Sequence, residues 1–121
     1  SEVRETLAAA RRKGIETRYL TADVADGTSL RQALDEVRQD FGPIVGLIHG
    51  AGVLADKRLE ELSDAEFVHV FGTKVLGAEM LLDATASDDL HVISLFSSIA
   101  ARAGNPGQSA YAAANAVLDS I

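Results

Sequence analysis

The chain has 121 residues, no cysteine, and 11 Lys and Arg against 18 Asp and Glu residues, which gives a formal net charge of −7. This length suits one domain, and the lack of cysteine excludes a disulfide scaffold, an iron–sulfur site and a zinc site with Cys ligands. The acidic balance argues against nucleic acid as the main partner, no apolar run approaches the roughly 18 residues of a membrane span, and no signal peptide is visible, so we expect a cytoplasmic α/β protein.

Helical and strand patterns alternate along the chain, which predicts a parallel sheet with helices packed on it. Apolar residues at helical spacing mark a first helix that Gly14 ends, and residues 15–21 predict the first strand. After the Asp26-Gly27 turn, Ser29 and Gln32 fit a capping box for a second helix that extends to about residue 41.

The second half of the chain continues the alternation. Residues 44–49 predict a buried second strand, and the Ser63–Glu66 capping box opens a long helix that ends near residue 86. Residues 90–96 predict the third strand, a loop covers 97–108, and the last helix covers 109–121. Doubly wound domains usually have six or more strands, so we expect further sheet on both sides of the chain.

Ligands of open parallel sheets bind beyond the carboxyl ends of the strands. Three clusters of small or polar residues follow the three predicted strands: Asp23-Val24, Gly50-Ala51-Gly52 and Ser97-Ser98. Turn residues stand at strand ends in any protein, and that alone explains each cluster. The alignment of all three favours a binding site.

Residues 50–55 fit the pattern G-x-G-x-x-[GA] after a strand. The dinucleotide fingerprint requires a helix that opens at once, so that its N–H groups meet the pyrophosphate. Here the next helix is expected only near Ser63. A better interpretation is that Gly50 and Gly52 let a cofactor sugar or ring approach the backbone closely.

Lys74 stands in an apolar stripe of the long predicted helix, together with Phe67, Phe71, Ala78 and Leu81. A charge in an apolar stripe is costly unless it is paired or used. The alternative is a lysine whose stem packs in the stripe while its ammonium reaches water.

Tyr111 and Asn115 are four residues apart on the last predicted helix, so they share a face. Their neighbours are alanines, which let a backbone or a ring lie close. Ser98 at a strand end and Tyr111 on a helix can converge on one carbonyl oxygen. A core tyrosine with a satisfied hydroxyl is the alternative interpretation.

The segments FSSIAARAGNPGQSAYAAANAVLD, HGAGVLAD and TKVLGAEMLL closely resemble the ketoreductase domain of modular polyketide synthases and related polyunsaturated fatty acid synthases. That domain belongs to the short-chain dehydrogenase/reductase superfamily. The resemblance implies a Rossmann-like doubly wound parallel sheet, with three of its strands here. It makes residues 1–121 the central part of one catalytic domain, without the N-terminal Gly-rich βα unit and the C-terminal strands.

The resemblance also implies roles for the candidate residues. Tyr111 protonates the ketone oxygen as hydride arrives from NADPH, and Ser98 donates a hydrogen bond to that oxygen. Lys74 and Asn115 complete the tetrad, exchanged relative to ordinary short-chain dehydrogenases, as in polyketide ketoreductases. No metal is implied. The residues expected along the cofactor are Asp23, Val24, Gly50, Ala51 and Gly52.

Leu54-Ala55-Asp56 resembles the L-x-D element of ketoreductases that give the B-type, D-configured alcohol. Ala103 occupies the position where A-type ketoreductases carry a tryptophan. An ordinary loop turn explains Asp56 equally well.

The expected function is NADPH-dependent reduction of a β-ketoacyl thioester to a β-hydroxyacyl thioester inside a multidomain polyketide or fatty acid synthase. The expected partners are the acyl carrier protein that presents the thioester and the neighbouring synthase domains. Two alternatives remain, a stand-alone short-chain alcohol dehydrogenase and a non-catalytic structural reductase-like subdomain. No phosphate-binding glycine loop precedes Ser1, so we expect the chain alone to bind NADPH poorly and to be inactive.

Overall fold

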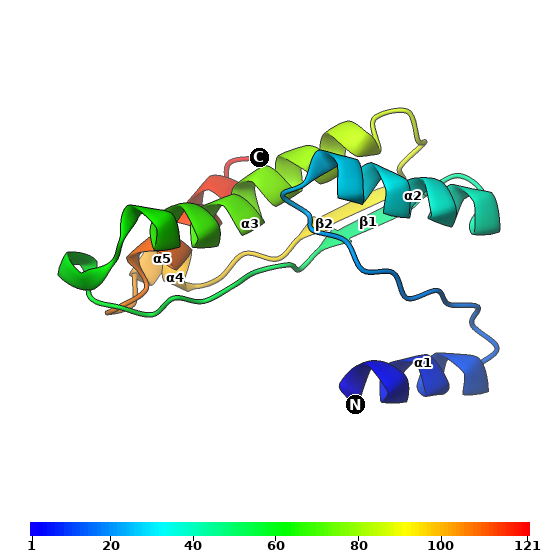
Figure 1. Cartoon of the computed structure of the whole chain (residues 1–121), viewed down its shortest axis with the longest axis horizontal. Helices are drawn as coiled ribbons and strands as arrows, with labels where there is room; N and C mark the ends of the chain where they lie inside the picture. The colour runs from blue at the N-terminus through cyan, green and yellow to red at the C-terminus, as the bar shows by residue number, and fades with distance from the viewer.

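The computed structural model describes residues 1–121 as an open arrangement of helices around a small sheet (Figure 1). The elements in chain order are α1 (Glu2–Arg12), α2 (Gly27–Phe41), β1 (Gly46–His49), the 3₁₀ turn η1 (Leu59–Glu61), α3 (Asp64–Ala84), β2 (Val92–Leu95), α4 (Ala100–Ala103) and α5 (Ser109–Leu118). Helices α2 and α3 lie over one side of the sheet, α4 and α5 pack near the first half of α3, and α1 lies apart. None of the helices combines the length and the apolar character that crossing a membrane requires.

The sheet consists of β1 and β2, which pair in parallel with Gly46 opposite Val92. Helix α3 is the crossover between them, as parallel pairing requires. Successive side chains of a strand point to opposite faces, so Leu47 and His49 are buried under the helices while Ile48 is 69% exposed. The predicted β–α–β order is confirmed over residues 44–96.

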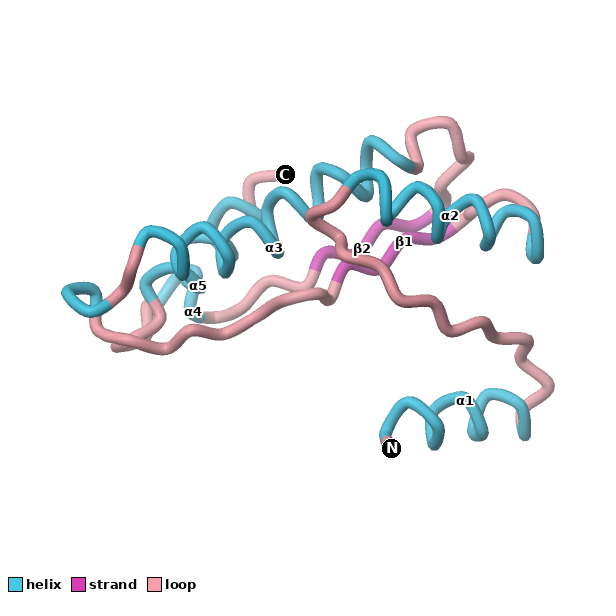
Figure 2. Tube along the Cα trace, viewed as in Figure 1, coloured by secondary structure: helices cyan, strands magenta, loops and turns pink.

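The predicted strand at residues 15–21 is wrong, and the sheet has two strands of the three expected. A strand exists through the hydrogen bonds of its ladder with a neighbour. Residues 15–21 instead lead as a loop from α1 to α2, away from β1 and β2 (Figure 2). All of their side chains except the half-buried Leu20 are exposed, with Tyr19 at 62%, and the segment joins no ladder.

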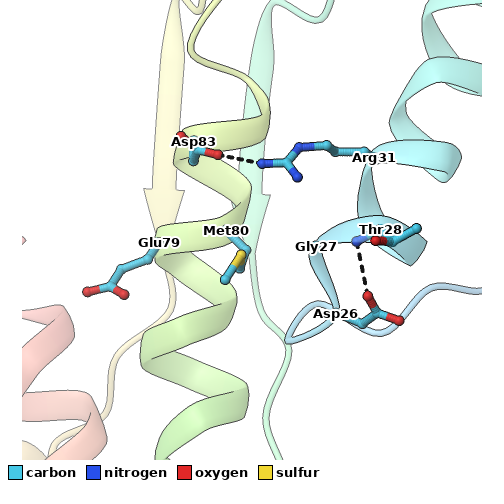
Figure 3. Close-up of a pocket in the computed structure, with 7 residues that line it drawn as sticks. All are labelled: Asp26, Gly27, Thr28, Arg31, Glu79, Met80 and Asp83. Carbon is cyan, nitrogen blue, oxygen red and sulfur yellow. Dashed lines mark hydrogen bonds and ion pairs between the residues drawn. The ribbon is translucent and has the colours of Figure 1, made fainter.

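Helix α2 begins three residues earlier than the Ser29–Gln32 box predicts. The carboxylate of Asp26 accepts from the backbone N–H groups of Thr28 at 3.0 Å and Ser29 at 3.4 Å, and so caps the helix from Gly27 (Figure 3). Aspartate is among the best N-cap residues, which explains why it takes this role. The hydroxyl of Ser29 instead accepts from the N–H of Asp23 at 3.3 Å.

The capping box of α3 is confirmed. The Ser63 hydroxyl accepts from the N–H of Glu66 at 3.2 Å, and the Glu66 carboxylate accepts from the N–H of Ser63 at 3.0 Å. The Lys57 ammonium also donates to Glu66. This bond, followed by those from Ser63, lowers the pKa of Glu66 to about 2.

The core joins α2, β1 and α3 through Leu30, Leu47 and Leu81. Burial of a leucine stabilises a fold by about 1.5–3 kcal/mol, so this small cluster fixes the three elements against one another. Beside it, Arg31 of α2 pairs with Asp83 of α3 at 2.8 Å across an open hollow (Figure 3). Both partners are exposed, so this ion pair contributes little.

A second ion pair is more enclosed. Arg38 donates to Asp88 at 2.6 Å and to the carbonyl of Ala84 at 2.7 Å, and Asp88 also accepts from the N–H of Ile44. The hydrogen bonds from Arg38 hold the pKa of Asp88 below its usual range. The resulting stabilisation is complete above the ordinary carboxyl pKa and is lost as the pH falls through the lowered pKa.

Helix α3 approaches β1 closely because residue 77 is glycine. A Cβ atom there would lie 2.9 Å from Cγ2 of Val24 and 3.2 Å from Cε1 of His49. We expect Gly77→Ala to destabilise the protein by about 1 kcal/mol, because overpacking of about 1–3 kcal/mol exceeds the gain in helix propensity. Urea unfolding of the protein measures this change.

Gly72→Ala is the matched control on the same helix. Its Cβ atom would meet only Cδ1 of Leu76, at an ordinary 3.5 Å. This substitution is expected to stabilise the protein by up to about 1 kcal/mol through helix propensity alone. A Gly77→Ala variant as stable as the Gly72→Ala variant would show that α3 has room to move away from Val24.

Candidate active site

The predicted site residues lie where the carboxyl ends of β1 and β2 meet α3 and α5. Lys74, in the third turn of α3, is only 4% exposed. Its ammonium donates to the carbonyl oxygen of Phe96 at 2.8 Å and lies 5.5 Å from the centroid of the Tyr111 ring. The lysine therefore does not extend its ammonium into bulk water. It holds the charge between the end of β2 and α5.

No carboxylate pairs with Lys74, since all the ion pairs of the chain involve other residues. Its partners are a carbonyl oxygen and the face of an aromatic ring, and the latter attraction amounts to about 0.5–2 kcal/mol. An ammonium has three donors and Phe96 takes one of them. Two donors and the positive charge remain for groups that enter the site.

Asn115 supports Tyr111 from within α5. Its side chain is completely buried, and its Nδ2 donates to the carbonyl oxygen of Tyr111 at 2.8 Å. The carbonyl of Asn115 in turn accepts from the hydroxyl of Ser97 at 3.2 Å, which ties α5 to the end of β2. The buried Oδ1 atom of Asn115 has no hydrogen-bond partner in the protein.

Ser98 follows β2 and is half-buried. Its hydroxyl oxygen accepts from the N–H of Ala100 at 3.2 Å, at the start of the short helix α4, which lies within the predicted loop of residues 97–108. Because the oxygen serves as acceptor, the hydroxyl proton stays free to be donated. Ser98 makes no hydrogen bond to Lys74, Tyr111 or Asn115, and is joined to them through its neighbour Ser97.

The three clusters at the predicted strand ends come together. Val24 and His49 both lie against Gly77, which places the Asp23-Val24 segment beside the end of β1. The N–H of Phe96 donates to the carbonyl of His49 at 2.9 Å, which joins the end of β1 to the end of β2. Asp23 itself is exposed, and its carboxylate accepts from the N–H of Ala25 at 2.9 Å.

The glycines after β1 keep this region open. A Cβ atom on Gly52 would lie 3.1 Å from Cε of Lys74, and one on Gly50 would lie 3.6 Å from the Phe96 ring. Ala51 between them is half-buried. A nicotinamide dinucleotide fits these features, because the backbone at Gly50 and Gly52 is uncovered and the adjacent ammonium has donors for hydroxyl groups.

The L-x-D element is connected to the loop before α5. Asp56 accepts from Nε2 of Gln108 at 3.0 Å, and Gln108 accepts from Nδ2 of Asn105 at 2.9 Å. The N–H of Lys57 donates to the carbonyl of Gly107 at 2.9 Å. The side chain of Leu54 is 63% exposed. The Asp56 carboxylate therefore braces the segment that leads to the Tyr111 helix.

Two residues that support the site, Gln108 and His49, were not predicted from the sequence. Gln108 lies in a loop whose composition indicates only a turn. The one signal for His49 was an ionisable residue at the end of an otherwise apolar strand. His49 is 2% exposed, and its Nε2 donates to the backbone carbonyl of Lys74 at 2.9 Å.

A parallel sheet with a helical crossover, and a lysine and a tyrosine at the carboxyl ends of its strands, define a Rossmann-like α/β protein of the short-chain dehydrogenase/reductase type. The model of the family described as KR domain matches residues 1–121. The chain therefore belongs to the KR-domain family, the ketoreductase domains of modular polyketide synthases.

This chain spans only a small part of the length of two similar proteins. A polyunsaturated fatty acid synthase protein of Thraustochytrium is 40% identical over 121 residues, which cover 99% of this chain and 4% of that protein. A reducing polyketide synthase of Cochliobolus heterostrophus is 42% identical over 118 residues, which cover 98% of this chain and 5% of that protein.

Two solved structures agree in fold. A ketoreductase domain from the bacillaene assembly line superimposes with a TM-score of 0.91 and 37% identity, over 98% of this chain and 29% of that one. A short chain dehydrogenase from Burkholderia cenocepacia in complex with NADP gives a TM-score of 0.83 and 27% identity, over 95% of this chain and 48% of that one. The Rossmann-like fold expected from the sequence is thereby confirmed.

Proposed function

We propose that this chain is the central, catalytic part of a ketoreductase domain that reduces a β-ketoacyl thioester to a β-hydroxyacyl thioester with NADPH. The observation that carries the proposal is the buried ammonium of Lys74, 5.5 Å from the Tyr111 ring and without a carboxylate partner. The similarity to domains of polyketide and polyunsaturated fatty acid synthases supports a setting within a multidomain synthase. The NADP complex of the similar dehydrogenase supports the choice of cofactor.

In this mechanism the Tyr111 hydroxyl gives its proton to the ketone oxygen, and the free proton of the Ser98 hydroxyl makes a hydrogen bond to the same oxygen. Lys74 stabilises the phenolate that remains on Tyr111 through its positive charge, and Asn115 holds the backbone of Tyr111 in place. A positioned general acid contributes about 10²–10⁴-fold to the rate. The nicotinamide, when bound, supplies the hydride that reduces the carbonyl carbon.

The cofactor would lie along the strand ends. Gly50, Ala51 and Gly52 would face its sugar and nicotinamide, and Asp23 and Val24 would lie beside the adenine. Lys74 has two donors left for hydroxyl groups of the cofactor. The thioester would be presented by an acyl carrier protein, with the neighbouring synthase domains as further partners in the cytoplasm.

Two observations favour this function over its alternatives. A scaffold gains nothing from burying Lys74 without a carboxylate, because desolvation of an unpaired charge is costly. A stand-alone alcohol dehydrogenase is disfavoured by the placement of lysine on α3 and asparagine on α5, the exchanged arrangement of polyketide ketoreductases.

The test uses the full-length protein that carries this chain. NADPH consumption is followed with an N-acetylcysteamine thioester of a short β-keto acid, and separately with a simple ketone without the thioester. We expect NADPH oxidation with the thioester and an equal amount of β-hydroxy product. No oxidation of NADPH with either substrate would favour the structural alternative, and reduction of the simple ketone alone would favour the stand-alone dehydrogenase.

The same assay tests the stereochemical part of the proposal. The L-x-D element at Leu54 to Asp56, held to Gln108, is proposed to direct hydride delivery so that the D-configured alcohol forms. Chiral chromatography of the product should show the D-alcohol in clear excess. An excess of the L-alcohol would overturn the role of Asp56 and leave the proposed reduction untouched.

A further inference from the structure

Three hydrogen bonds join His49, Phe96 and Lys74 into a closed ring. The imidazole Nε2 of His49 donates to the backbone carbonyl of Lys74 at 2.9 Å. The carbonyl of His49 accepts from the N–H of Phe96 at 2.9 Å, and the carbonyl of Phe96 accepts from the ammonium of Lys74 at 2.8 Å. The ring connects the third turn of α3, the end of β1 and the residue after β2.

His49 is the only residue of this ring besides Lys74 that takes part through its side chain. Because the Lys74 carbonyl can only accept, Nε2 must carry a proton, and Nδ1 is buried without a partner. Cε1 of His49 lies against Gly77, where a Cβ atom would come within 3.2 Å. The imidazole is therefore enclosed between β1 and α3 and can reach no other acceptor.

We propose that His49 is a positioning residue for Lys74, an inference that rests on the proposed function of Lys74. A lysine side chain has four flexible carbons, so its ammonium is placed only when the backbone and the acceptor are both fixed. His49 fixes both, because its side chain holds the Lys74 carbonyl and its backbone holds Phe96, which accepts from the ammonium. The position of the charge beside Tyr111 thus depends on an imidazole on the neighbouring strand.

Simple packing does not require a histidine at this place. An apolar side chain would fill the space under α3 without leaving a buried nitrogen unpaired, which costs free energy. The proposal therefore depends on the donor at Nε2 and not on the volume of the ring. Two variants separate these possibilities, since Gln retains a donor at a similar distance from the backbone whereas Met has a similar length and no donor.

The first measurement is kinetic and uses the full-length protein. His49→Met is expected to lower kcat for the β-ketoacyl thioester by about 10- to 100-fold, the effect of a misplacement of about 1 Å, with KM little changed. His49→Gln is expected to recover most of the kcat at the same KM. The proposal is overturned if His49→Met keeps the wild-type kcat, or if His49→Gln loses as much as His49→Met.

The second measurement does not depend on activity. Reductive methylation of the full-length protein is followed by mass spectrometry of the peptides that carry the three lysines of this chain, with the exposed Lys13 as internal standard. Lys74 should be protected in the wild type and in His49→Gln, and labelled several-fold faster in His49→Met. Unchanged protection in His49→Met overturns the proposal even in a protein without reductase activity, whereas failure of the proposed function shows only in the wild-type kinetics.

If His49→Met does not fold, His49→Asn takes its place. Its amide is too short to reach the Lys74 carbonyl, so it should show the same loss of kcat and the same increase in Lys74 labelling. Wild-type kcat and protection in this folded variant would overturn the proposal equally well.

Discussion

Tyr111→Phe is expected to abolish reduction of the β-ketoacyl thioester while the fold stays intact. The substitution removes the proposed proton donor, so kcat should fall by at least about 10²–10⁴-fold. The hydroxyl of Tyr111 makes no hydrogen bond within the protein, and the ring that faces the Lys74 ammonium remains. Single-turnover NADPH oxidation measures the chemical step, and thermal unfolding should show an unchanged midpoint.

The chain offers a matched control, because Tyr19 is its only other tyrosine. Tyr19 is 62% exposed in the loop between α1 and α2 and makes no contact with the proposed catalytic residues, so Tyr19→Phe should leave kcat and stability unchanged. Wild-type turnover in Tyr111→Phe would remove Tyr111 from the proposed mechanism. A loss of turnover together with a lower unfolding midpoint would show that the hydroxyl supports the structure.

The parts of the fold that could be predicted are those that local patterns determine. The Ser63–Glu66 box gave the start of α3, and the apolar run of residues 44–49 gave β1. Residues 15–21 have an equally good strand pattern, but a strand also needs a neighbouring strand to pair with, and the local pattern contains no information about that neighbour. The start of α2 was misplaced because Asp26 competes successfully with Ser29 for the cap.

In the candidate site, too, features set by local patterns could be predicted, and contacts between distant residues could not. The sequence pointed to Lys74 because a charge interrupts an apolar stripe, and the structure explains that charge through its contacts with Phe96 and Tyr111. The supporting contacts could not be predicted, because they join residues far apart in the chain. His49 and Lys74 are 25 positions apart, and Asp56 and Gln108 are 52 positions apart. Only the crossover of α3 and the return of the chain into α5 bring these pairs together.

Lys74→Met is expected to fold at least as well as the wild type and to lose most of the reductase activity. Methionine fills the space of the lysine stem, and the substitution removes the cost of burying an ammonium that has no carboxylate partner. The freed carbonyl of Phe96 lies on a residue that is 58% exposed, so water can replace the lost donor. Thermal unfolding and kcat are measured on the same protein, with Lys13→Met on the exposed end of α1 as the control.

The charge and the phenol are proposed to act as one unit, and a double variant tests this directly. If the role of Lys74 is to stabilise the phenolate of Tyr111, then removing the ammonium from a protein that already lacks the phenol should have no further effect. Lys74→Met combined with Tyr111→Phe should therefore be no slower than Tyr111→Phe alone, as expected for strongly coupled residues. Losses that multiply would assign the lysine an independent role, such as binding the cofactor. Full activity in Lys74→Met alone would show that the charge of Lys74 has no catalytic role and that its side chain only fills space in the core.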